Sequence, residues 1–163
     1  MGAFPVFSYI CQVISYHAAL CIRFGLVEEG LYAVKEIFDW SIERNCIFSA
    51  DVYGNPGAIY MTHPVHWALP EAFTGAAWDA ASQTLRLDPQ ILEGDEKQVY
   101  PLFFPDFWAL LHMEKEGPAI IKVIKSSEPA PEVTTLLLGP TRKRMNLQHP
   151  WRLAAGAEYP ILL

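Results

Sequence analysis

The chain has 163 residues, of which 52% are apolar and only 18% are charged. This length suits one ordinary domain, and the composition indicates either a large core or apolar surface kept for a partner. The formal net charge is −6, so the chain lacks the basic face that a nucleic-acid binder needs to displace counterions. We therefore expect no nucleic-acid partner.

The N-terminal stretch and the cysteines bear on the compartment. No basic residue precedes Arg23, so the stretch lacks the charged leader of a secretory signal. Its apolar run is interrupted by polar residues and is short for a transmembrane segment, so we expect a buried helix instead. The cysteine count is odd, with Cys11, Cys21 and Cys46, which argues against a disulfide framework. We expect a cytoplasmic protein with buried thiols.

Two helices are predicted at the start of the chain. Residues 8–24 are apolar nearly all round, which predicts a helix buried on most faces, and Gly25 ends it. Residues 26–43 form the second helix, with Glu28 and Glu29 in the first turn, where the helix dipole favours negative charge. Its expected apolar stripe consists of Val27, Leu31, Val34, Phe38 and Ile42. The two segments therefore predict a tight helical hairpin.

A long loop and a short helix are expected next. Residues 44–60 are rich in Gly, Asn, Asp and Pro, a composition typical of a long and often functional loop. A helix from about residue 63 to 73 follows, with Pro64 at its first position, a bend at Pro70 and an end at Gly75.

The period then changes from about 3.6 to 2, which predicts strands. Strands are expected over residues 84–89, 97–113, 119–125 and 133–138. Pro101 and Pro105 divide the second of these into two segments and are most tolerable at a sheet edge or bulge. The tail from Gly139 shows no clear period. Helices first and strands after is the order of an α+β fold with segregated parts.

The stretch "YMTHPVHW" (60–67) is the first candidate for chemistry. His63 and His66 lie three apart and could reach one ion, but zinc needs at least three protein ligands and no acidic or thiol partner is close in sequence. The structural interpretation is stronger, because Thr62 or His63 can cap a helix that starts at Pro64. The first turn of that helix could face a sugar or could be a packed helix end, and periodicity leaves both open.

Two longer motifs carry a family resemblance. The segment "GLVEEGLYAVKEIFDWSIERN", followed about twenty residues later by "Y…WALPEAFTGAAWD…TLRLDP", resembles the C-terminal end of the catalytic region of glycoside hydrolase family 116. That family includes the non-lysosomal glucosylceramidases, or bile-acid β-glucosidases, and bacterial relatives. The resemblance runs from about Cys11 to about Lys125. It implies the last helices of an (α/α)6 barrel or toroid over residues 1–75, followed by a small antiparallel β region over residues 76–163.

The resemblance also implies retaining hydrolysis of β-glycosides by two carboxylates about 5 Å apart. In the family both carboxylates lie upstream of the "GLVEEGL" helix, so this chain is expected to hold neither. The missing N-terminal part of the same enzyme is then a partner, a glycoside is the substrate, and no cofactor is expected.

Substrate contacts are expected in the loop before Trp67. The family's motif E-x-E-C-G-x-H-Y-A-R, anchored on Trp67, places its Gly at Gly57 and its Tyr at Tyr60, but its last Arg falls at Thr62 and its two Glu fall at Tyr53 and Asn55. The glycine and tyrosine are kept and the charged sugar contacts are not, which implies a changed substrate. The candidate substrate-binding residues are Asp51, Asn55, Tyr60, Thr62 and His63.

Three functions compete at this point. The leading hypothesis is the C-terminal portion of a β-glycosidase, inactive when isolated. The alternative is a stand-alone carbohydrate-binding or interaction module without catalysis. A weaker third is a small metal-dependent enzyme that uses His63 and His66 with His17 or His112. For any catalysis by the chain alone, the possible carboxylates are Asp51, Glu71, Asp79 and Asp106, and their spacing singles out no pair.

Overall fold

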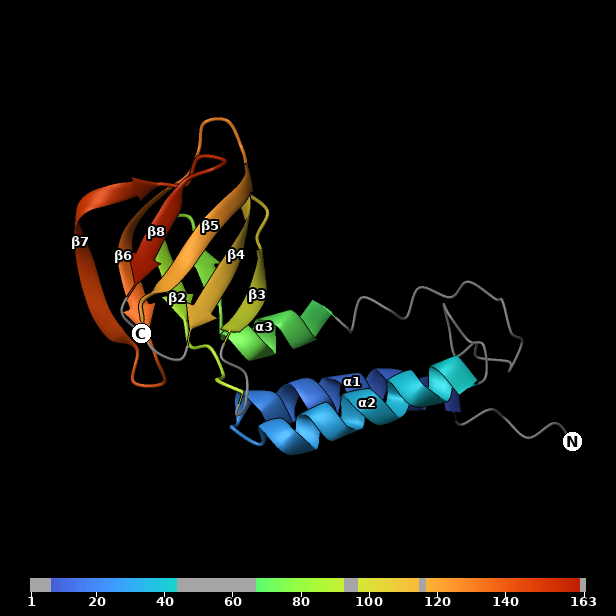
Figure 1. Ribbon diagram of the computed structural model, residues 1–163. Coiled ribbons are helices and arrows are strands. Elements are labelled where there is room, and N and C mark those ends of the chain that lie inside the picture. The colour runs from blue at the N-terminus through green and yellow to red at the C-terminus, as the bar shows by residue number, and fades with distance from the viewer. Residues whose placement is uncertain (1–6, 44–66, 93–96, 115–116, 162–163) are drawn as a thin grey trace, which may run out of the picture. The chain divides into compact units, whose positions relative to one another are not determined.

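The computed structural model describes residues 7–43, 67–92, 97–114 and 117–161 (Figure 1). The chain divides into two compact units, Met1–Ala72 and Phe73–Leu163, and each is considered by itself. Within the described ranges the order is three helices followed by eight strands. The helices lie in the first unit, apart from the last two residues of the third, and the strands lie in the second.

A helical hairpin forms the described part of the first unit. Helix α1 (Phe7–Arg23) and helix α2 (Val27–Glu43) run side by side in Figure 1, as predicted. The turn between them depends on Gly25, whose φ of 81° is open to glycine at no steric cost. Two backbone hydrogen bonds close the end of α1, from Gly25 N to Ile22 O (3.1 Å) and from Leu26 N to Cys21 O (2.9 Å).

The two helices approach most closely at Gly30. A Cβ atom at this position would lie 2.8 Å from the backbone oxygen of Ala18 and 2.6 Å from Cγ1 of Ile22. Ala18 and Ile22 are fully buried, so the absence of a side chain at Gly30 sets the distance between α1 and α2.

Large apolar side chains on both helices are nevertheless exposed. Phe24 is 81% exposed and Phe38, in the expected stripe of α2, is 63% exposed. Tyr16, Leu20 and Tyr32 are also exposed. Over residues 14–23, where the burial of α1 is described, the expected burial on most faces is thus not met. The composition's other alternative, apolar surface without cover, describes these parts of the hairpin.

Helix α3 (Ala68–Thr74) is short and ends at Gly75, whose φ is 54°. A side chain at Gly75 would meet the backbone oxygen of Asp88 at 2.7 Å. Two hydrogen bonds hold this part of the chain, from Asp88 N to Thr74 O (2.8 Å) and from Gln90 N to Phe73 O (2.7 Å). The predicted end of the helix at Gly75 is therefore confirmed, while its predicted start at Pro64 lies outside the described residues.

The second unit contains two four-stranded sheets (Figure 1). The first sheet has the order β1 (Ala77–Asp79), β2 (Thr84–Leu87), β6 (Glu132–Leu138) and β7 (Lys143–Arg152). The second sheet has the order β3 (Lys97–Phe103), β4 (Phe107–Glu114), β5 (Ala119–Ser126) and β8 (Glu158–Ile161). Pairing is antiparallel except between β2 and β6, which run parallel.

Both sheets contribute to one hydrophobic core. Buried side chains alternate with exposed or half-buried ones along β3 and β4, as expected for strands with one covered face. Leu85 and Leu87 of the first sheet and Phe107 and Leu111 of the second are essentially inaccessible to solvent. Pro101 lies within β3, which is an edge strand of its sheet, where the missing N–H is tolerated.

The predicted fold class is wrong. We expected an α+β fold in which the last helices of an (α/α)6 barrel precede a small antiparallel β region. The described residues contain three helices, of which α3 has only seven residues, and eight strands in two sheets, one of them with a parallel pair. Strands β7 and β8 occupy the tail in which the sequence showed no period. The described structure is therefore mostly β.

Among the helices of the described ranges, none combines the length and the apolar character that crossing a membrane requires.

Candidate functional site

The five substrate-contact residues predicted from the sequence, Asp51, Asn55, Tyr60, Thr62 and His63, all belong to the stretch 44–66. That stretch lies outside the described residues, as does His66. The first described residue after it is Trp67, which is 63% exposed. The predicted sugar contacts therefore stay predictions.

The other candidate carboxylates of the described structure serve local architecture. Glu71 forms an ion pair with Arg23, with 2.7 Å between Oε1 and Nη2. Asp106 accepts a hydrogen bond from Nε1 of Trp78 at 2.8 Å. Asp79 accepts hydrogen bonds in the turn that follows it. Each carboxylate thus holds a neighbouring part of the chain.

The structure describes two of the four histidines of the metal hypothesis, His17 and His112. His17 lies one helical turn before Cys21, with 3.5 Å between Nε2 and Sγ. His112 lies on β4, in the other unit. Across the described ranges, no three His, Cys, Asp or Glu side chains gather closely enough to hold a metal ion.

An exposed aromatic surface lies on the outer side of the second sheet. Phe103 and Trp108 are directly paired across β3 and β4, and their rings meet edge to face with centroids 5.8 Å apart. Trp108 is 47% exposed and Phe103 is 46% exposed. On the next strand, Nζ of Lys125 lies 5.0 Å from the centroid of the Trp108 ring. We call the surface formed by Phe103, Trp108 and Lys125 the aromatic face.

Alternation in the sequence explains why these side chains point outward. In β4, Phe107, Ala109, Leu111 and Met113 are buried, so the residues between them lie on the opposite side of the sheet. The register between β4 and β5 shifts between Trp108 and Ala109, and Trp108 is paired with Lys125. A local irregularity of this kind re-aims a side chain. The segment "FWALLHM" carried this signal, but the sequence analysis assigned it only to a strand.

Other charged pairs lie on the same sheet. Lys97 and Glu114 pair across β3 and β4 at 3.1 Å, six residues along each strand from Phe103 and Trp108, and Lys122 and Glu158 pair across β5 and β8 at 3.0 Å. Val99 and Ile124 are about half exposed. The charged group in contact with the Trp108 ring is therefore Lys125.

The aromatic face has a defined chemical capacity. An aromatic ring carries negative charge on its face, which attracts cations and weakly positive C–H groups. The ammonium of Lys125 already exploits this attraction. The face of a pyranose ring presents several such C–H groups, while its hydroxyls point to the ring edge, where charged side chains can bind them. Lys125 lies over the Trp108 ring, so a sugar that stacks on that face would have to displace its ammonium.

Comparisons with known proteins place the chain in no family. No family model matches it, and no curated protein matches it. A solved structure that is similar is described as "Putative kojibiose phosphorylase from human microbiome", with a TM-score of 0.46 and 13% sequence identity. The likeness covers 90% of this chain and 17% of that chain, so this chain spans about one sixth of that protein. The likeness is distant, and membership of family 116 is not confirmed.

Proposed function

We propose that the chain is a non-catalytic portion of a glycoside hydrolase acting on β-glycosides and that its aromatic face binds the sugar chain. The observation that carries this proposal is the half-exposed Trp108 ring, which meets the Phe103 ring in a T-shaped arrangement and has Lys125 over its face. A large rigid side chain that remains half exposed in a folded sheet costs little entropy when it binds a ligand.

The resemblance to family 116 supports the same proposal from the sequence. Its motifs cover α2, α3 and β2. In this proposal the catalytic carboxylates belong to the remainder of the enzyme, and Asp51, Asn55, Tyr60, Thr62 and His63 contact the substrate near that centre. A helical part over 1–75, a β part over 76–163 and a cytoplasmic location belong to the proposal as well.

The uncovered helices support a protein partner. The helical hairpin exposes most of the side chains of Phe24, Tyr32 and Phe38. Single exposed apolar residues are ordinary, but several large ones on two neighbouring helices are typical of an interface. The remainder of the hydrolase is the partner that the proposed function supplies.

The second candidate is a carbohydrate-binding module without catalysis. It is favoured by the core of the second unit, to which both sheets contribute buried side chains such as Leu85 and Phe107. A unit with its own core can bind a glycan without neighbours. The two candidates differ in what they require: the enzyme portion needs a partner chain, and the module does not.

Binding of a β-linked glucan oligosaccharide to the full chain tests the aromatic face. Stacking on an aromatic side chain contributes about 1–3 kcal/mol for a nucleic-acid base. If a sugar face gains an energy of the same order, Trp108→Ala should weaken binding by roughly tenfold. Tryptophan fluorescence and isothermal titration calorimetry measure this change. Tyr32→Ala, which removes an exposed aromatic side chain from the helical hairpin, should leave binding unchanged.

A hydrolysis assay distinguishes a non-catalytic portion of an enzyme from a complete enzyme. The isolated chain should not cleave a fluorogenic β-glucoside. Cleavage that is lost on replacing a single carboxylate of this chain would contradict a non-catalytic role, and equal binding by the Trp108→Ala variant and the unchanged chain would remove the aromatic face from the proposal.

A further inference from the structure

A second site is formed by two loops of the β unit. The loop that follows β5 contributes Ser126, Ser127, Glu128, Pro129 and Ala130, and the segment around the end of β7 contributes Arg152, Ala154 and Ala155. Together they line a cavity of about 350 Å³. We propose that this cavity binds a single neutral pyranose, such as the end residue of a glycan.

Both loops are fixed to the strands behind them. Ser127 N donates to Asp106 O at 2.8 Å, and Leu153 N donates to Pro131 O at 2.9 Å. On the other side, Gly156 N donates to Val123 O and Val123 N donates to Ala157 O, each at 2.9 Å. The cavity is thus formed before a ligand arrives, which lowers the entropy cost of binding.

Two hydrogen bonds hold the backbone carbonyl of Arg152. Its carbonyl oxygen accepts a hydrogen bond from Ala154 N at 2.6 Å and another from the Tyr159 hydroxyl. The Tyr159 ring stacks on Trp151, with centroids 4.8 Å apart. Partial burial raises the pKa of Tyr159 above its ordinary value, and its hydroxyl is protonated at neutral pH with or without this shift. The guanidinium of Arg152 therefore projects from an anchored position.

The polar lining of the cavity provides unsatisfied donors and acceptors. The Ser126 hydroxyl donates to Ser127 O at 3.3 Å and the Ser127 hydroxyl donates to Pro129 O at 3.1 Å, so both hydroxyl oxygens remain free to accept. Among the residues that the structure describes, the guanidinium of Arg152 and the carboxylate of Glu128 form no ion pair. Arg152 can only donate and ionised Glu128 can only accept.

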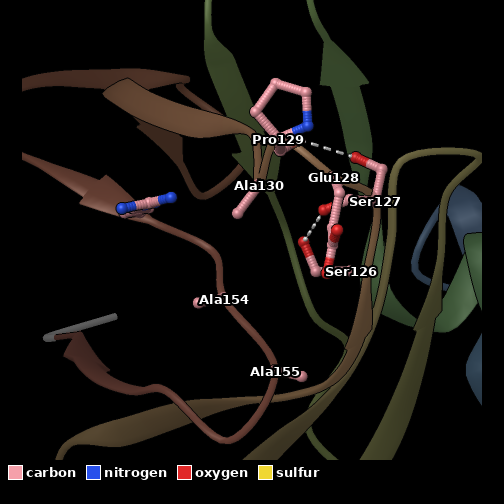
Figure 2. A pocket seen from close by; sticks show the side chains of 8 residues that line it. Ser126, Ser127, Glu128, Pro129, Ala130, Ala154 and Ala155 are labelled. Carbon is pink, nitrogen blue, oxygen red and sulfur yellow. Dashed lines mark hydrogen bonds between the residues drawn. The ribbon is translucent and has the colours of Figure 1, made fainter.

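The remaining lining is small and apolar. Figure 2 shows Ser126, Ser127 and Glu128 along one side of the hollow and Ala154 and Ala155 along the segment that faces them. Pro129 and Ala130 add further apolar surface. A pyranose needs this combination, because its hydroxyls both donate and accept while its C–H face is apolar.

Charge decides between a sugar and a small anion. One guanidinium and one carboxylate give the lining no net charge, so an anion such as sulfate would meet the repelling carboxylate of Glu128 as well as the attracting guanidinium of Arg152. The volume lies near the lower end of the roughly 300–1,000 Å³ typical of ligand pockets, which suits one ring rather than a chain. A zwitterion such as glycine is the competing ligand that the same charges allow.

Chemical-shift titration of the full chain tests the site. The choice of a sugar rests on the proposed function, so methyl β-D-glucopyranoside, glycine and sulfate are titrated separately. The glucoside should give saturable shifts at the amides of residues 126–130 and 154–155, with a dissociation constant on the order of 1 mM. Arg152→Ala, Glu128→Gln and Ala155→Leu, which fills the cavity, should each weaken binding by roughly tenfold.

Two matched variants serve as controls. Lys143→Ala removes an exposed cation from the same strand, and Ala81→Leu adds the same side chain at an exposed turn outside the cavity. Both should bind the glucoside unchanged. The proposal is overturned if the cavity amides do not respond, if Ala155→Leu binds equally well, or if glycine or sulfate binds more tightly than the glucoside.

The proposals for the two sugar sites can be tested separately. Trp108→Ala should leave the glucoside shifts at the cavity intact, because no residue of the aromatic face lines the cavity. If an oligosaccharide still binds at Trp108 while the cavity amides stay still, only the cavity assignment is lost. If neither surface binds a sugar, the proposed function is lost as well.

Discussion

The turn after β1 shows how one side chain sets its local electrostatics. Both carboxylate oxygens of Asp79 accept hydrogen bonds, Oδ2 from the Ser82 hydroxyl at 2.6 Å and Oδ1 from the backbone N–H groups of Ala81 and Ser82. These bonds, above all the one from the Ser82 hydroxyl, hold the pKa of Asp79 below its ordinary value. Each donor binds the charged carboxylate more strongly than the neutral acid, so these bonds favour the ionised form.

Ser82→Ala should therefore raise the pKa of Asp79, because it removes the strongest of these donors. A carbon-detected NMR titration of the carboxylate measures the change. A depressed pKa contributes stability above the unfolded value of about 3.9 and loses it as the pH falls through the folded value. The contribution is thus full at neutral pH and disappears in acid.

A comparison with Asp79→Asn checks the sign. The difference in stability between this variant and the unchanged chain should shrink as the pH is lowered below the ordinary Asp range. Ser127→Ala, in a distant loop, should leave the Asp79 titration as it was. A Ser82→Ala variant whose Asp79 titrates at the same pH as in the unchanged chain would show that the hydroxyl has no effect.

The sequence carried the least information about which individual residues form a site. The family motif anchored on Trp67 placed the candidate contacts in 44–66, a stretch outside the described residues. The aromatic face and the cavity both depend on partners that are distant along the chain, such as Ser126 and Arg152. A hydroxyl and a guanidinium 26 positions apart have no periodic signature, so only the pairing of strands brings them together.

At the scale of elements, the hairpin of α1 and α2 depends on Gly30. Replacing a glycine within a helix by alanine ordinarily favours the helix by about 1 kcal/mol. Here the new Cβ would lie 2.8 Å from the backbone oxygen of Ala18, which cannot rotate away as a side chain can. Overpacking of this kind costs about 1–3 kcal/mol, so Gly30→Ala should lower the stability of the hairpin.

Thermal unfolding followed by far-ultraviolet circular dichroism measures this loss. Glu36→Ala, at an exposed position in the middle of α2, places the same side chain in the helix without the clash and should not lower the melting temperature. A Gly30→Ala variant that melts at or above the temperature of the Glu36→Ala variant would show that α1 and α2 tolerate a wider separation.

Elements were predictable wherever one face is covered. The strands at 84–89, 119–125 and 133–138 were recognised because buried and exposed side chains alternate, as in β5. Strand β7 was missed for the converse reason. It is an edge strand with nearly all of its side chains exposed, so no alternation is imposed on its sequence. The parallel pairing of β2 with β6 was equally invisible, because the two strands are far apart in the chain.

For the whole molecule, the misassigned fold class came from extending a resemblance beyond what the residues required. The α1–α2 hairpin and β2 agree with the sequence patterns, but those patterns specify neighbours along the chain and not the number of layers. Strands of both sheets bury the side chains that make the core, including Leu85, Leu111 and Leu136. This non-local burial makes the described structure mostly β.

The burial also predicts that the second unit folds alone. Residues 73–163 contain all eight strands and the hydrophobic cluster that both sheets share. A core of this kind is what an independent domain requires.

Residues 73–163 expressed alone should therefore unfold in a single cooperative transition. In this unit, Phe107→Ala should lower the free energy of unfolding by about 3–5 kcal/mol, because Phe107 is only 1% exposed. Val99→Ala, at a half-exposed position of β3, should cost much less. Urea unfolding followed by fluorescence measures both variants. A broad, non-cooperative transition, or equal losses for the two substitutions, would mean that the β unit depends on the helices for its core.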